Sequence, residues 1–121
     1  MKLLSLALVL VSPFAALADH HGKKPLKALM ITGGCCHDYK NQKNIISEGI
    51  SERVKTKWDI FFEMDQAKSK AHLSKKGWAD GFDYIVYNHC FAHEKDASFV
   101  KSITDIHKAG NPALALHCAM H

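Results

Sequence analysis

Histidines and cysteines follow three separate apolar runs in this 121-residue sequence. The first run leads into Cys35-Cys36-His37-Asp38, and the second leads into His89-Cys90. The third ends in His117-Cys118, with His121 a few residues further on. Imidazole transfers protons near neutral pH, a thiolate is a strong nucleophile, and both groups ligate metals. These residues can act together only if the three runs end at the same place.

Elements that would bring the runs together are visible in the pattern. Apolar, β-branched and aromatic residues predict strands over 26–32, 58–64, 84–88 and 113–117. Asp38 and Asp96 are suitable helix caps, and apolar stripes predict helices over 40–55 and 97–108. A short helix is expected near 72–76. Strands that alternate with helices predict a parallel sheet covered on both faces.

The predicted fold is therefore α/β, a flavodoxin-like three-layer sandwich with strand order 2-1-3-4. All strands then point the same way, so the residues that follow them gather on one edge. Ligands of open α/β sheets bind outside the carboxyl ends at the switch point, here between the first and third strands. The sequence thus predicts a His, Cys and Asp site along this edge.

The chemistry of that site has several readings. His37 and His117 are candidate acid–base or ligand groups, Asp38 is a candidate to orient a histidine, and Cys118 is a candidate nucleophile. A sharp nucleophile turn needs small residues two positions either side, whereas Cys118 has Leu116 and Met120.

Candidate ligand-binding groups lie on the same edge. A ligand would contact the following residues: Gly33, Gly34, Asn88, His89, His121. The two glycines would allow a ligand to approach the backbone closely. A divalent metal is an open alternative, with four histidines able to hold it: His37, His89, His117, His121. No tight ligand spacing such as HExxH or CxxC is present.

The cysteines and the other histidines also have structural explanations. Cys90 and Cys118 end neighbouring predicted strands, so a disulfide or two buried thiols are open alternatives to chemistry. His72 and His107 are expected at the surface.

The N-terminal region has the pattern of a targeting segment. Lys2 precedes an apolar stretch and Ala16-Leu17-Ala18 is a typical cleavage site, so residues 1–18 are predicted to be a signal peptide. Residues 19–25 are predicted to be a linker. We expect an exported protein, periplasmic or secreted, with no stable membrane anchor after cleavage. Residues 26–121 would form one domain.

The charge pattern argues against nucleic acid as a partner. The formal net charge is +4, it comes from scattered lysines, and Arg53 is the single arginine. A nucleic-acid interface needs basic residues clustered with aromatic ones.

Three blocks of the sequence together resemble the ThuA-like (trehalose-utilisation) family, of the class I glutamine amidotransferase-like superfamily: KALMITGGCCHDY, DYIVYNHCFAH and AGNPALALHCAMH. The family's Gly-Gly-x-x-His-Asp motif falls on Gly33, Gly34, His37 and Asp38, and its third block includes His117, Cys118 and His121. Its second block includes Asn88 and Cys90. The resemblance implies the flavodoxin-like fold and a role in carbohydrate metabolism. ThuA-like domains continue beyond the third block, so we expect this sequence to be the N-terminal part of a longer domain.

The sequence therefore predicts an exported ThuA-like domain that acts on or binds a sugar-type small molecule. A non-catalytic carbohydrate-associated binding module and a metal-dependent hydrolase are the alternatives.

Overall fold

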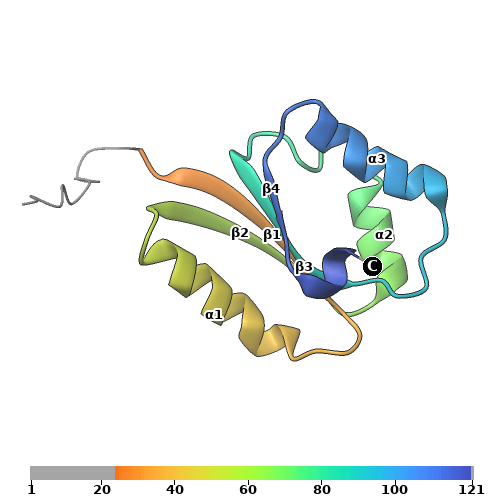
Figure 1. Cartoon of the computed structure of the whole chain (residues 1–121), viewed down its shortest axis with the longest axis horizontal. Coiled ribbons are helices and arrows are strands. Elements are labelled where there is room, and N and C mark those ends of the chain that lie inside the picture. Colours follow the sequence, from red (N-terminus) through yellow and green to blue (C-terminus); the bar gives the residue numbers. More distant parts are fainter. Residues whose placement is uncertain (1–23, 121) are drawn as a thin grey trace, which may run out of the picture.

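Four parallel strands form the centre of the protein. The structure is a computed structural model that describes residues 24–120 (Figure 1). The strands are β1 (Leu26–Gly34), β2 (Thr56–Glu63), β3 (Tyr84–Cys90) and β4 (Ala113–Ala115), in the order β2-β1-β3-β4. The helices are α1 (Tyr39–Ser51), α2 (Gln66–Leu73) and α3 (Ala97–Lys108), and a 3₁₀ helix, η1, spans His117–Met120. The predicted α/β fold and strand order are confirmed.

Helices cover both faces of the sheet, as in a three-layer sandwich (Figure 1). On one face, Leu29 and Ile85 of the central strands pack with Leu73 of α2 and Phe99 of α3. On the other face, α1 packs against β1 and β2, and its Tyr39 joins Cys90 and Cys118 in a smaller buried cluster. Consecutive strand residues point to opposite faces, so each central strand contributes to both layers.

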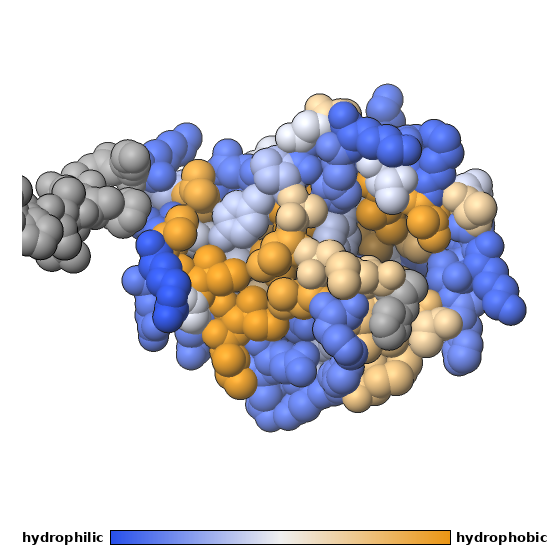
Figure 2. All heavy atoms as spheres, viewed as in Figure 1, coloured by the Kyte–Doolittle hydropathy of each residue, from blue (hydrophilic) through white to orange (hydrophobic). Residues whose placement is uncertain are grey.

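The α1 face is covered only in part. Figure 2 shows a band of apolar side chains at the surface between α1 and β4. Ile45 of α1 is 67% exposed, and Leu114 of β4 is 44% exposed. The stripe predicted for this helix therefore contributes less to the core than its pattern indicates.

Helix starts follow the predicted caps. The carboxylate of Asp38 accepts a hydrogen bond from the amide of Asn41, and that of Asp96 accepts from the amides of Ser98 and Phe99. Helix α3 has the predicted bounds. Helix α1 ends at Ser51 rather than near residue 55, and α2 begins earlier than predicted because Asp65 caps it.

Both central strands run two residues further than predicted. Gly33 pairs with His89 and Gly34 with Cys90, so these four residues belong to the sheet rather than to the loops after it. Strand β4 is shorter than predicted and ends at Ala115. The chain then turns at His117, whose φ is +37°, and enters η1. These bounds decide which side chains reach the edge of the sheet.

Candidate functional site

Two histidines meet one cysteine at the carboxyl edge of the sheet. The Sγ of Cys118 lies 3.0 Å from Nε2 of His37 and 3.1 Å from Nδ1 of His117. The two imidazole rings have their centroids 5.7 Å apart, at an interplanar angle of 75°. The structure thus brings together three of the four predicted catalytic residues, which come from segments about eighty residues apart in the chain.

Local structure explains how each side chain reaches this point. His37 lies in the loop between β1 and α1, directly before the capping residue Asp38. His117 has a left-handed backbone where β4 turns into η1, and Cys118 follows it into the buried cluster with Tyr39. At a strand-to-helix turn the left-handed residue is the one presented outward, and here that residue is His117. The histidine is exposed and the thiol is buried.

The shared thiol can make the two imidazoles chemically different. A neutral thiol has one proton to donate, so it can donate to at most one of the two facing ring nitrogens. A ring nitrogen that receives no proton from the thiol can donate its own proton to sulfur. If sulfur is a thiolate instead, both rings can donate to it. The neutral thiol thus allows one histidine to act as a hydrogen-bond acceptor while the other acts as a donor.

A cavity of about 210 Å³ lies beside the two histidines. Its lining combines polar groups with apolar surface and is formed by eight residues: His37, Tyr39, Gln42, Asn88, His89, Leu116, His117, Cys118. It is smaller than the roughly 300–1,000 Å³ of pockets for drug-sized molecules, so it suits a small ligand.

Asn88 and His89 both line this cavity and are both buried. The amide of Asn88 donates to the hydroxyl of Thr32 across the sheet, at 3.2 Å. His89 is 8% exposed, and its Nδ1 is buried without a hydrogen-bond partner in the described part of the chain. Burial lowers the pKa of His89 to about 4. A hydrogen bond with the backbone of Ile31 acts in the opposite direction but is the smaller effect. His89 is therefore a neutral imidazole at neutral pH.

Other predicted site residues have clear structural roles. A Cβ on Gly33 would lie 1.8 Å from the carbonyl oxygen of Glu63, and a Cβ on Gly34 would lie 2.2 Å from that of Cys90. Close packing of neighbouring strands thus accounts for both glycines. The carboxylate of Asp38 accepts hydrogen bonds from the backbone amide and from the side-chain amide of Asn41, and it caps α1. Ligand contact by the glycines and orientation of a histidine by Asp38 stay predictions.

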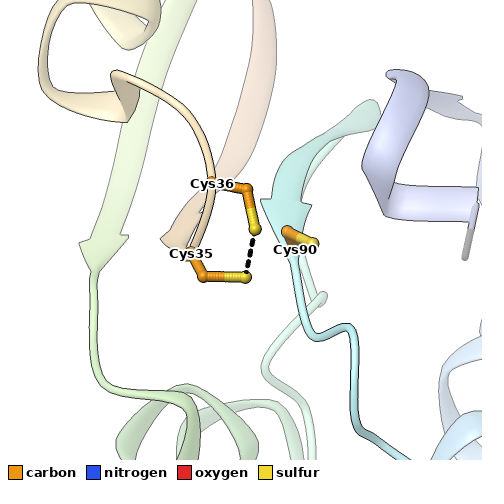
Figure 3. A group of neighbouring side chains, drawn as sticks. All are labelled: Cys35, Cys36 and Cys90. Atoms are coloured by element: carbon orange, nitrogen blue, oxygen red, sulfur yellow. Dashed lines mark hydrogen bonds between the residues drawn. The ribbon is translucent and has the colours of Figure 1, made fainter.

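Three further cysteines lie close together at the end of β1. Figure 3 shows Cys35 and Cys36 side by side, with Cys90 of β3 facing them. The thiol of Cys36 donates to Sγ of Cys35 at 2.7 Å, which lowers the pKa of Cys35 and raises that of Cys36. Burial and neighbouring thiols raise the pKa of Cys90 to about 12. All four cysteines are free thiols, so the structure contains no disulfide between Cys90 and Cys118.

Two predictions fall outside the described residues. His121, expected in the ligand site, lies beyond residue 120. The signal peptide at 1–18 and most of the linker at 19–25 precede residue 24. Within residues 24–120, no helix is both long enough and apolar enough to span a membrane.

Sequence reasoning missed some residues of the site and misplaced others. Tyr39 is buried against Cys90 and Cys118, and its hydroxyl has no hydrogen-bond partner among the described residues. Its position directly after a capping aspartate gave no sign of this. His107 is half-buried rather than on the surface, because its ring bonds the Tyr87 hydroxyl at 2.7 Å and contacts the carbonyl of Asn111. His72 is also half-buried, because its ring stacks on Phe61.

The chain was compared with models of protein families, with curated proteins and with solved structures. None of the three comparisons finds a match.

Proposed function

We propose that this chain is an exported, ThuA-like domain that binds a sugar-type small molecule at the carboxyl edge of its sheet and acts on it with His37 and His117. Export rests on the leader pattern of residues 1–18, and the family rests on the three sequence blocks. The binding site and the chemistry rest on the structure of the edge.

The observation that carries the proposal is the contact of both histidines with one thiol beside a cavity that several polar side chains line. Sugars present hydroxyl groups that both donate and accept hydrogen bonds. Imidazole, amide and phenol groups line the cavity, and such groups match a polyhydroxy ligand. The cavity volume of about 210 Å³ is suited to a ligand of monosaccharide size.

The histidine pair also supports acid–base chemistry. A reaction at a sugar carbon needs one group to take a proton from a hydroxyl or a C–H and another to return one. Because the Cys118 thiol can donate to only one imidazole at a time, it allows His37 and His117 to hold opposite roles, one accepting from sulfur and the other donating to it. Transfer of a proton to or from the ligand then changes the state of one ring, and the thiol can pass a proton to the other.

Binding is testable with the monosaccharide glucose as the probe. Titration calorimetry and ligand-observed NMR would compare the chain with its His37→Gln and His117→Gln variants. Each variant keeps polarity and loses the proton-transfer group. We expect affinity to fall by about tenfold, the effect of about 1.4 kcal/mol, for each. His93→Gln is the control, since His93 is exposed and outside the cavity lining.

Unchanged affinity in both histidine variants would refute the proposed site. Recovery of the intact sugar from a complex that never turns over would favour a non-catalytic binding module instead.

A second function, a metal-dependent hydrolase, has one observation in its favour. The donor atoms of His37, His117 and Cys118 all lie within 4.8 Å of one another. Catalytic zinc takes three protein ligands and leaves a fourth position for water. Equilibrium dialysis against Zn²⁺ followed by elemental analysis would test it. One equivalent that is lost in Cys118→Ser would support a metal centre, and no stoichiometric metal would eliminate it.

A further inference from the structure

We propose that Cys35, Cys36 and Cys90 form a three-sulfur site for a soft, thiophilic cation, with Cu(I) as the representative. The site shares no ligand with the His37, His117 and Cys118 group, although its Cys90 packs against Cys118. It does not depend on the function proposed for that group. Three observations carry the inference: the sulfur geometry, the way the sheet fixes it, and the uniform donor set.

The sulfur atoms lie at the right separation for one metal ion. All three Sγ atoms are within 4.8 Å of one another. Three sulfurs around a central ion, with bonds of about 2.3 Å, would lie about 4.0 Å apart in a trigonal plane. The contact between Cys35 and Cys36, at 2.7 Å, has to open by about 1.3 Å. Both side chains are exposed and can rotate outward to make that room.

The sheet holds the third sulfur against the first two. Gly34 pairs with Cys90 at the last rung of β1 and β3, so the residues directly after Gly34 start beside Cys90. Cys90 is buried and fixed within its strand. Cys36 has a φ of +83°, a backbone conformation that is unfavourable for a residue with a side chain. That turn keeps both neighbouring thiols on the side of Cys90, as Figure 3 shows.

The donor set selects the class of ion. The three ligand atoms are all sulfur, and thiolates prefer Cu(I) and other soft ions over the hard cations that oxygen ligands bind. The neighbouring group supplies two imidazoles and one thiol, which suits zinc better. The two groups therefore differ in the metal they favour, and this difference can be measured.

A redox pair is the other use of adjacent thiols. Joining Cys35 to Cys36 needs a two-electron oxidant and leaves Cys90 without a role. It also closes a small ring across one peptide bond, which is a strained arrangement. A metal ion uses all three sulfurs and needs only the loss of their protons.

The test is an anaerobic Cu(I) titration of the full chain against a chromogenic Cu(I) chelator, with ascorbate as reductant. X-ray absorption would then identify the bound atoms. We expect one tightly held Cu(I) with three sulfur neighbours. Cys35→Ser and Cys36→Ser should each weaken Cu(I) binding by more than about tenfold. Changes to residues that only support a metal ligand already cost about that much, and these variants remove a ligand itself. Both positions are exposed, so these variants should keep the fold, which circular dichroism verifies. The paired His37→Gln/His117→Gln variant should retain the copper and its three-sulfur spectrum.

Several results would overturn the proposal. They are the absence of saturable Cu(I) binding, equal affinity in the Cys36→Ser variant, and nitrogen among the copper neighbours. Loss of copper from the double histidine variant would also overturn it, by assigning the ion to the other group. Mass spectrometry that finds a disulfide between Cys35 and Cys36 in chain purified with ascorbate would do the same.

Discussion

His89 should make the stability of this protein fall as the solution becomes mildly acidic. Its ring is 8% exposed and lies against the rings of Tyr87 and Phe91. Burial lowers its pKa from 6.5 to about 4. Between these two values the unfolded chain binds a proton that the folded chain does not, so falling pH favours unfolding. The stabilisation is complete above about pH 6.5 and is lost as the pH falls towards about 4.

The size of the effect follows from the two pKa values. At about 1.4 kcal/mol per pKa unit, the difference between 6.5 and about 4 corresponds to about 3 kcal/mol of unfolding free energy. About 2 kcal/mol of it should be lost by about pH 5. That is a large share of the ~5–15 kcal/mol that stabilises a typical domain.

Urea unfolding of the chain and of a His89→Gln variant, from about pH 7.5 to about pH 5, would measure this contribution. The variant should lose about 2 kcal/mol less than the parent over that range. His72 also has a pKa lowered by burial, and Glu94 has a lowered pKa, but both act equally in the two proteins. The control is His93→Gln, which changes an exposed ring and should keep the parent's pH dependence.

The reasoning would be refuted if the free energy of unfolding fell with pH equally steeply in the chain and in the His89→Gln variant. NMR of the His89 ring in the unaltered chain gives an independent check that does not require the variant to fold. A midpoint near 6.5 for that ring would contradict the burial argument.

Two further predictions concern backbone glycines, and a third concerns a helix cap. Gly33→Ala should lower the unfolding free energy by more than about 2 kcal/mol, because φ is +135° and the added Cβ meets Glu63. Gly49→Ala in α1 should raise the unfolding free energy by about 0.5–1 kcal/mol, since nothing lies within 4 Å of the added Cβ. Thermal melts in which Gly33→Ala is more stable than Gly49→Ala would contradict both predictions. Asp96→Ala should lower the unfolding free energy by about 1 kcal/mol because it removes the cap of α3. Asp96→Asn should lower it less because an amide oxygen can still cap the helix. Equal melting temperatures for the two variants would contradict the capping role.

The fold was within reach of the sequence because its signals are local. Apolar runs and capping aspartates at Asp38 and Asp96 fixed the elements, and the rule for parallel crossovers restricted their order. The convergence of His37, His117 and Cys118 followed from that order, since carboxyl ends of parallel strands share an edge.

What the sequence could not show depends on register. The glycines at 33 and 34 look like the end of a strand, yet with positive φ they continue the ladder beside β3. That continuation draws His89 and Cys90 into the sheet and explains the burial of His89. It also sets Cys90 against the two exposed thiols, a contact between positions 54 residues apart that no local pattern encodes.

The glycine pair in β1 bears on how related sequences should be interpreted. Its two positions lie so close to the backbones of β2 and β3 that any side chain there collides with a carbonyl. A relative that keeps both glycines therefore reports only that its strands are spaced in the same way. A relative that keeps the glycines but replaces the histidine three residues later would retain the architecture and lose the proposed chemistry. To judge whether a relative shares the proposed activity, the positions to compare are His37 and the turn that carries His117 and Cys118. The more conspicuous Gly-Gly motif is not informative for this purpose.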